Sequence, residues 1–365
     1  MTHNKRIVVL GAGISGLSVA LRLHELGFQT EIFEAQDHIG GLAGTIRPDD
    51  GKYCLDFGPH FFITQKQEIV DRITDLVDDN VVSFERSAQL HVQGRFLDYP
   101  LSAKNVLLNF PLADAISSVA TFIWAQLKQG VQITSEPDVH RYHFGEWAAA
   151  NFGSHLANIF FRPYTEGFWK LPCDQLSPEI LPTSTRLNFM KSLKMMLLRK
   201  VSGQARSLTE RELVLPLRYP TSGYGVIAEA IAERVLSMGG VLHLNSRVSE
   251  IRAVKDGVYT IVASRNGQVI ELQADQVIST IPTPDLVGMM CPDAPAKIRE
   301  SAKQLGYLAL IVLYVVTSKR DILDTSYVYY LGRPYHRLAE MDKFCDTLCP
   351  PGENMLAVEF SCHHG

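Results

Sequence analysis

The amino-terminal part of the chain alternates short apolar runs with an apolar pattern of helical period. Ile7–Leu10 is a β-branched run of the kind that a strand buried on both faces needs. Apolar residues then recur at helical spacing from Leu17 to Leu26, and Gly27 is a typical residue to end a helix. A second β-run, Thr30–Phe33, follows. The pattern predicts a strand, a helix and a parallel second strand.

The rest of the chain alternates helical and strand patterns in the same way. Helical patterns are predicted at 67–77, 102–130 (interrupted by Pro111), 144–161 and 226–238. Strand patterns are predicted within 81–96, at 241–251, 257–264, 269–274, 277–282, 308–316 and 355–360. Asn266-Gly267, between two alternating runs, is a strong signal for a hairpin. Residues 186–211 are basic and read as a surface excursion.

A glycine motif, Gly11-Ala12-Gly13-Ile14-Ser15-Gly16, joins the first strand to the first helix. Gly11 permits the tight turn, Gly13 lets a pyrophosphate approach the backbone, and Gly16 lets helix and strand pack closely. The helix N-terminus offers N–H groups to phosphates, and Glu34 at the end of the second strand can accept hydrogen bonds from ribose hydroxyls. Glycines could instead serve only the turn, but this strand–helix–strand–acid context favours dinucleotide binding.

A second glycine cluster, Gly40-Gly41-Leu42, follows Glu34 and would bring another backbone segment against the same pyrophosphate. At this point the chain resembles the FAD-containing amine oxidase superfamily, which includes protoporphyrinogen oxidases, monoamine oxidases, phytoene desaturases and, more distantly, UDP-galactopyranose mutases. The resemblance implies FAD as the cofactor. The expected cofactor-binding residues are Gly11, Ala12, Gly13, Ile14, Ser15, Gly16, Glu34, Ala35, Gly40, Gly41, Leu42, Gly58, Pro59, His60, Phe61, Val248 and Ser279.

The segment Gly58-Pro59-His60-Phe61 is part of this resemblance, because the superfamily places a similar motif beside the flavin ring. Galactopyranose mutases carry GPHxFH here, and this chain has Ile63 at the second histidine. His60 could accept a proton near flavin N5, since imidazole titrates close to neutrality. It could equally be a packed histidine bonded to backbone carbonyls. Val248 is expected to contact the adenine through its backbone, by resemblance alone.

Two segments in the middle of the chain also resemble the protoporphyrinogen-oxidase-like and mutase-like branch. They are Gly94-Arg95 with 99–101, and 161–172 with its aromatic and proline positions. Arg162, Tyr164 and Trp169 could line a substrate pocket, with Arg162 binding an anion bidentately; the alternative is aromatic packing with an exposed arginine. Gly167 and Lys170 depart from the usual lysine and glycine of this segment. No catalytic residue is assigned.

The resemblance implies an α/β fold: a Rossmann-like FAD-binding domain with a parallel sheet and a β-ribbon, interleaved with an α+β substrate domain that contains a helical subdomain. We expect residues 1–85 and 215–285 in the FAD-binding domain and residues 86–214 and 286–365 in the substrate domain. The superfamily closes its FAD site with a C-terminal glycine–acid segment. We find no such segment after Gly306 and expect it to be missing.

Composition narrows the class of protein. The chain of 365 residues is 46% hydrophobic and 20% charged with a net charge of −4, which is typical of a globular protein and offers no basic run for nucleic acid. The scattered cysteines and the motif so near Met1 predict a cytoplasmic protein without a leader. Cys345 and Cys349 lack zinc-site spacing, so no metal is expected. The apolar segment Ala113–Leu127 is predicted to be a buried core helix, with peripheral membrane contact as the alternative.

Three functions follow from these patterns. The first is an FAD-dependent oxidoreductase that passes hydride from a bound small organic substrate to flavin N5. The second, motivated by the partial GPHxF match, is a redox-neutral sugar mutase of the UDP-galactopyranose mutase type. The third is a non-catalytic nucleotide-binding remnant. Flavin bleaching by substrate would support the oxidoreductase. Turnover only after dithionite reduction would support the mutase, and a protein that stays colourless with added FAD would support the remnant.

Overall fold

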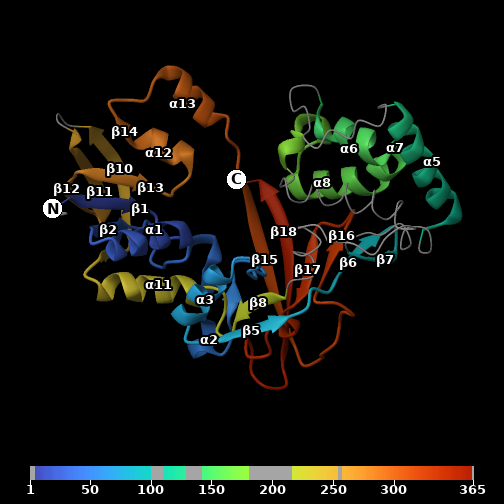
Figure 1. The fold of residues 1–365 in the computed structure, drawn as a ribbon, viewed down its shortest axis with the longest axis horizontal. Coiled ribbons are helices and arrows are strands. Elements are labelled where there is room, and N and C mark those ends of the chain that lie inside the picture. Colours follow the sequence, from blue (N-terminus) through green and yellow to red (C-terminus); the bar gives the residue numbers. More distant parts are fainter. Residues whose placement is uncertain (1–4, 100–109, 129–141, 181–215, 254–256, 364–365) are drawn as a thin grey trace. The chain divides into compact units, whose positions relative to one another are not determined.

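A computed structural model describes residues 5–99, 110–128, 142–180, 216–253 and 257–363. These residues form two compact units that the chain enters in turn (Figure 1). The first unit comprises Met1–Phe61, Lys66–Val82 and Tyr219–Tyr307, and the second comprises Phe62–Gln65, Ser83–Arg218 and Leu308–Gly365. The segments 100–101 and 186–211, which the sequence singled out, lie outside the described residues.

The first unit is built on a parallel sheet in the order β13-β1-β2-β9. Its elements are β1 (Arg6–Leu10), α1 (Ile14–Glu25), β2 (Gln29–Phe33), β9 (Val241–His243) and β13 (Gln276–Ser279). Ile7, Val8, Val9 and Leu10 are all buried, as a strand covered on both faces requires. The predicted βαβ unit and α/β fold class are confirmed.

A second sheet in this unit has the order β12-β11-β10-β14. It consists of β10 (Ser246–Ala253), β11 (Tyr259–Arg265), β12 (Gln268–Ala274) and β14 (Met290–Cys291). The predicted Asn266-Gly267 hairpin is present, with both residues at positive φ. The unit is completed by η1 (Gly41–Ala43), β3 (Thr45–Ile46), α2 (Pro48–Gly51), β4 (Leu55–Asp56), α3 (Gln67–Leu76), α11 (Val226–Ser237), α12 (Thr283–Met289) and α13 (Ala296–Lys303).

The first compact unit extends to Tyr307, beyond the domain boundary expected at residue 285, and so includes the segment 286–307. Leu286 and Met289 of α12 pack against the buried cluster formed by β1, β2 and the β10–β12 ribbon. This apolar contact holds α12 to the unit that already contains the preceding strand β13. The chain passes between the units within β5 (Val81–Phe84) and β8 (Leu217–Pro220).

The second unit combines a mostly antiparallel sheet with a group of helices. The sheet order is β15-β18-β17-β16-β6-β7. The strands are β6 (Ala88–Val92), β7 (Arg95–Asp98), β15 (Leu308–Thr317), β16 (Tyr327–Tyr330), β17 (Arg337–Glu340) and β18 (Asn354–His363). The helices are α5 (Leu112–Lys128), α6 (Phe144–Phe152), α7 (Ser154–Leu156), η2 (Ala157–Phe161), α8 (Arg162–Trp169), η3 (Cys173–Gln175), η4 (Pro178–Ile180) and η6 (Met341–Lys343).

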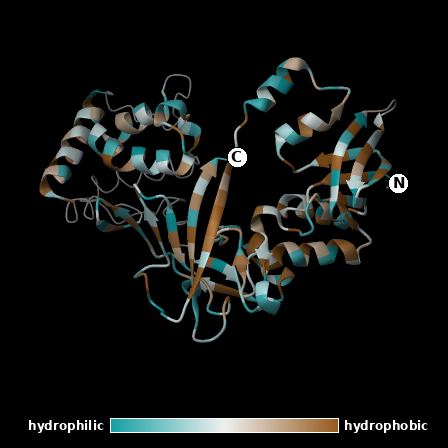
Figure 2. Cartoon of the chain, turned by 180° about the vertical axis from the view of Figure 1, so that it is seen from behind, coloured by the Kyte–Doolittle hydropathy of each residue, from teal (hydrophilic) through white to brown (hydrophobic). Residues whose placement is uncertain are grey.

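Apolar residues concentrate in the sheet strands of both units, as Figure 2 shows by hydropathy. The burial of α5 differs from its prediction. The helix buries small residues, Ala115, Ser118 and Ala125, and exposes large ones such as Trp124 at 69%. The prediction of a buried core helix is therefore wrong for this face, because the helix is apolar on more sides than its neighbours cover. None of the helices in the described ranges has the length and hydropathy of a membrane span.

Candidate functional site: a glycine-lined cavity in the first unit

The turn between β1 and α1 depends on two glycines. Gly11 has φ +95° and donates its N–H to Phe33 O at 2.8 Å, which joins the turn to the end of β2. A Cβ on Gly16 would lie 2.0 Å from Gly11 O, so only glycine lets the helix begin directly against the strand. As at any helix N-terminus, the first N–H groups of α1 lack acceptors within the helix. The first turn of α1 contains no acidic residue.

The second glycine cluster lies directly against the first. Gly13 and Gly40 form a parallel bridge, and Gly40 donates its N–H to Ala12 O at 2.9 Å. Gly40 has φ +98°, and a Cβ there would lie 2.9 Å from Gly44 Cα. The two glycine segments, which lie on either side of β2 in the sequence, therefore meet backbone to backbone with no side chain between them.

Glu34 connects the end of β2 to this glycine turn. Its Oε2 accepts the Ala12 N–H at 2.8 Å, and its Oε1 accepts the Gln36 N–H at 2.9 Å. Each carboxylate oxygen can accept more than one hydrogen bond, so capacity remains for hydroxyl donors. The backbone of Glu34 is fixed as well, because Ser246 donates its N–H to Glu34 O at 2.7 Å.

These residues surround a cavity of about 760 Å³ that lies entirely within the first unit. Gly13 borders it with extended, ordinary φ and ψ, and a Cβ there would meet no protein atom closer than 3.9 Å. The protein therefore leaves room for about one methyl group at Gly13, at the edge of the cavity where a diphosphate would approach the backbone. The lining residues are Leu10, Gly11, Gly13, Ile14, Ser15, Phe33, Glu34, Ala35, Gln36, Gly40, Gly41, Leu42, Ala43, Ser246, Arg247, Val248, Thr280, Ile281, Pro282, Thr283, Asp285, Met289 and Tyr307.

The structure brings most of the predicted cofactor-binding residues to this cavity. Ala12 and Gly16 stand behind it: Ala12 donates to Glu34, and Gly16 packs under Gly11. Ser279 ends β13 next to the lining residue Thr280, and its buried Oγ has no hydrogen-bond partner among the described residues. The cavity is also lined by three residues that the sequence did not predict as cofactor-binding: Arg247, Thr280 and Tyr307. Arg247 stands beside the predicted Val248, and that adjacency was the one signal available in the sequence.

The predicted segment Gly58–Phe61 does not line this cavity and instead adjoins a buried polar cluster. The ring of His60 stacks on Tyr224 with 5.2 Å between centroids. Asp56, only 2% exposed, accepts hydrogen bonds from Tyr219 Oη and Thr45 Oγ1, each at 2.5 Å, and from the Tyr224 N–H at 3.0 Å. Burial raises the pKa of the Asp56 carboxyl above its ordinary value. This cluster ties β3 and β4 to the segment before α11.

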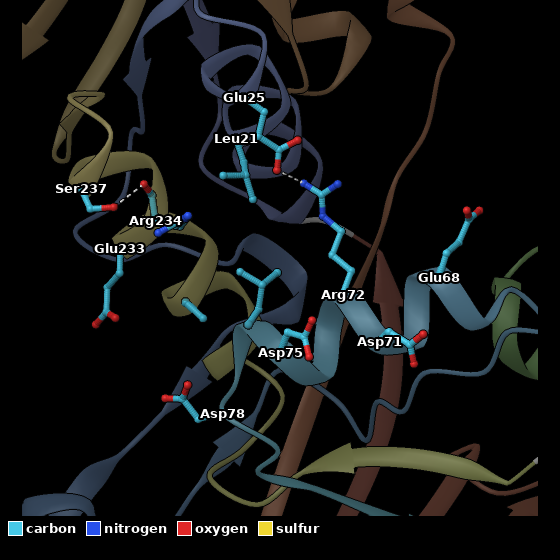
Figure 3. Close-up of a pocket in the computed structure, with 12 residues that line it drawn as sticks. Leu21, Glu25, Glu68, Asp71, Arg72, Asp75, Asp78, Glu233, Arg234 and Ser237 are labelled. Carbon is cyan, nitrogen blue, oxygen red and sulfur yellow. Dashed lines mark hydrogen bonds and ion pairs between the residues drawn. The ribbon is translucent and has the colours of Figure 1, made fainter.

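A second hollow in the first unit, of about 840 Å³, is far more acidic than the glycine-lined cavity (Figure 3). It lies among α1, α3 and α11, and its two arginines are outnumbered by carboxylates. Arg72 is itself paired with Glu25 at 2.5 Å. The acidic lining residues are Glu25, Glu68, Asp71, Asp75, Asp78 and Glu233. These charges would repel a diphosphate, so the glycine-lined cavity is the better dinucleotide site.

The three predicted substrate-binding residues lie in the second unit. Arg162 is paired with Glu166 at 3.2 Å and with Asp174 at 3.4 Å. Tyr164 lies edge-on to Tyr329 with 5.8 Å between ring centroids, and burial raises the pKa of its hydroxyl. Trp169 packs against the apolar core of the helices. The three residues therefore come from one helix, α8, but Arg162 is already engaged in ion pairs and the two aromatic rings in packing.

A buried ion pair in the second unit was not predicted. Arg337 of β17 binds Glu359 of β18 through two nitrogens, with Nη2 2.7 Å from Oε1. Glu359 is only 1% exposed, and His336 Nε2 lies 3.7 Å from its Oε2. The pair depends on the register between the successive strands β17 and β18, which composition and periodicity do not reveal. No group of metal-ligating side chains occurs within the described ranges.

The chain matches the family model described as flavin containing amine oxidoreductase over residues 14–363. The Klebsiella pneumoniae protein named "Probable UDP-galactopyranose mutase" is 26% identical over 180 residues, which are 49% of this chain and 44% of that protein. A phytoene desaturase (neurosporene-forming) from Rhodobacter capsulatus is 24% identical over 298 residues, 75% of this chain and 52% of that protein. The chain thus spans about half the length of these two curated relatives.

Solved structures show the same fold at low sequence identity. Reduced UDP-galactopyranose mutase has a TM-score of 0.78 at 23% identity, covering 99% of this chain and 75% of that one. A putrescine oxidase variant has a TM-score of 0.64 at 17% identity, covering 98% and 75%. The match to the family model over residues 14–363 confirms the resemblance indicated by the glycine motifs. The chain belongs to the family of flavin containing amine oxidoreductases, and its predicted cofactor, FAD, is confirmed with it.

Proposed function

We propose that the protein is an FAD-dependent oxidoreductase that oxidises a small organic substrate. The observation that carries this proposal is the cavity lined by Gly13, Gly40 and Glu34, in which Gly13 presents its bare backbone and Glu34 is hydrogen-bonded to the glycine turn. The family assignment supports it, because the family is one of flavin oxidoreductases. In this proposal the first unit binds the cofactor and the second unit binds the substrate.

Bound FAD would supply the hydride acceptor, its N5 atom, and a second substrate such as oxygen would later take the electrons. The chain's own residues bind and orient. The glycine turn and the N-terminus of α1 would hold the diphosphate, and Glu34 would accept hydrogen bonds from the ribose. Val248 would present its backbone to the adenine, and the segment Gly58–Phe61 would lie beside the ring.

The substrate class is open among the chemistries that the relatives' names indicate, a polyene in phytoene desaturase and an amine in putrescine oxidase. We propose Tyr164 and Trp169 as residues that shape the substrate site, because both are aromatic residues on α8. For Arg162 an anion would have to displace Glu166 or Asp174. We also propose a cytoplasmic location, on the cysteine usage of the sequence.

An anaerobic absorption experiment tests the proposal. The purified chain, reconstituted with FAD, is mixed with phytoene in detergent or with putrescine under exclusion of oxygen. Loss of the oxidised flavin absorbance with one of them supports an oxidoreductase. A protein that binds FAD yet stays oxidised with both is inconsistent with these two substrate classes. A chain that stays colourless with added FAD supports the third alternative, a non-catalytic remnant.

A redox-neutral sugar mutase is the second candidate. It is favoured by Gly58-Pro59-His60 and by the fold similarity to reduced UDP-galactopyranose mutase. The mutase proposal is weakened by Ile63, which stands where the mutase motif GPHxFH has its second histidine. The measurement is conversion of UDP-galactopyranose with and without dithionite. Conversion that requires prior reduction and consumes no electron acceptor would replace the oxidoreductase proposal with this one.

A further inference from the structure

We propose that Arg247 is a cofactor-binding residue that contacts the adenosine half of FAD. Arg247 is the second residue of β10 and lines the glycine-lined cavity between Ser246 and Val248. The inference concerns only this chain's affinity for the dinucleotide, so it holds for either reaction considered above.

The backbone around Arg247 is fixed on the same side of the cavity as Glu34. Ser246, the preceding residue, donates its N–H to Glu34 O at 2.7 Å. Val248, the following residue, pairs with Ala263 of β11, and an irregularity in the strand register follows between Val248 and Glu250. Arg247 therefore directly follows a residue that is hydrogen-bonded to the backbone of Glu34, whose side-chain carboxylate can receive the ribose. This places it at the adenosine end of the site.

The charges of the cavity point the same way. Arg247 is the single cation among the lining residues, beside the carboxylates of Glu34 and Asp285. It is exposed, and within the described ranges its guanidinium has no ion-pair partner. Arg252, farther along the same strand, is in contrast paired with Glu250 and Glu271. Arg247 thus keeps its donors and its planar face available for a ligand.

A guanidinium in this position suits the adenosine half of a dinucleotide. It can stack on an aromatic base and can donate hydrogen bonds to phosphate or ribose oxygens. We expect the flavin half to lie away from Arg247, because the expected ribose acceptor Glu34 marks this end of the cavity as the adenosine end. The inference predicts that Arg247 acts on ligands that contain adenosine and leaves ligands without it unaffected.

The test compares Arg247→Gln with Arg265→Gln in the full chain. Arg265 lies on β11 directly opposite Ser246, is exposed and does not line the cavity, so its variant makes the same charge change on the same ribbon. FAD binding to each apoprotein is followed by fluorescence quenching, and ADP and FMN binding by calorimetry. We expect Arg247→Gln to weaken FAD and ADP about tenfold or more, with FMN and Arg265→Gln within about twofold of wild type.

Each other outcome overturns the inference in a distinguishable way. Wild-type affinity of Arg247→Gln for FAD and ADP would show that the side chain does not contact the cofactor, while the flavin assignment would stand. An equal loss in Arg265→Gln would show a general effect of surface charge. A wild-type chain that binds neither FAD nor ADP would remove the cofactor site itself, and with it the proposed function.

Discussion

The backbone N–H of Ala12 lies 2.8 Å from Glu34 Oε2, so the carboxylate that ends β2 is tied to the glycine turn that follows β1. This one contact places the expected ribose acceptor at the expected phosphate turn. It links two functions that the sequence could only assign separately. The affinity of the site for FAD should therefore depend on Glu34 through both the turn and the ribose.

Glu34→Ala should weaken FAD binding about tenfold or more, because it removes the acceptor for the Ala12 N–H and for a ribose hydroxyl. Glu34→Gln, which keeps one acceptor oxygen, should lose less. Glu31→Gln on the same strand is the control, since Glu31 pairs with Arg6 and His243 and does not line the cavity. Equal FAD dissociation constants for Glu34→Ala and wild type would contradict this role.

Gly16→Ala should destabilise the first unit by about 3 kcal/mol or more, because its Cβ would overlap the Gly11 carbonyl oxygen. The matched control is Gly288→Ala in α12, where a Cβ meets nothing within 4 Å. Thermal unfolding of the two variants without cofactor gives the comparison. The packing explanation would be wrong if both variants unfolded at the wild-type temperature.

Asp56→Ala should cost about 3 kcal/mol or more of stability, because Tyr219, Thr45 and Tyr224 would each keep a donor without its acceptor. Asp56→Asn retains an acceptor oxygen and should cost less. Denaturant unfolding of the two variants measures the difference. Were Asp56→Asn as damaging as Asp56→Ala, the charge of the carboxylate rather than its hydrogen bonds would hold the cluster.

His336 should make the folded state sensitive to acid. Burial lowers the pKa of His336 from 6.5 to about 4, so the unfolded chain binds a proton there that the folded chain does not. Stability from this residue is present above pH 6.5 and is lost as the pH falls toward 4. Between pH 7 and pH 5 the loss is about 2 kcal/mol.

His336→Phe keeps an aromatic ring against Phe168, whose centroid lies 4.9 Å from that of His336, and it cannot titrate. As the pH drops from 7 to 5, the wild type should therefore lose about 2 kcal/mol more unfolding free energy than this variant. Parallel pH dependences for the two proteins would show that folding does not lower the pKa of His336.

Local chemistry explains which features could be predicted from sequence. The βαβ unit follows from its periodicity, and Gly11, Gly13, Gly16 and Glu34 follow from what a dinucleotide requires of a strand–helix turn. The positions of the 286–307 segment and of Arg337 beside Glu359 could not follow, because they depend on packing and strand register between distant residues. Arg247 was not predicted because an exposed arginine in a strand carries no distinguishing pattern beyond its position next to Val248.

The helix α5 shows a different limit. Its apolar residues were correctly read as helical in spacing, but the number of apolar residues says nothing about how many faces its neighbours cover. Ala115 and Ala125 are buried, whereas Leu112 and Leu127 are exposed at 75% and 71%. In this helix the small apolar residues are buried and the large ones are exposed, the reverse of what a core helix would show.

The most direct test of the cofactor site is FAD binding by Gly13→Ala. A Cβ at Gly13 meets no protein atom closer than 3.9 Å and the backbone there is in an ordinary extended conformation, so the apoprotein should unfold at the wild-type temperature. The methyl group would occupy the space over the turn where the diphosphate approaches. We predict wild-type apoprotein stability together with FAD binding weakened at least about tenfold. Unchanged FAD affinity in a folded Gly13→Ala variant would contradict a dinucleotide diphosphate over this turn.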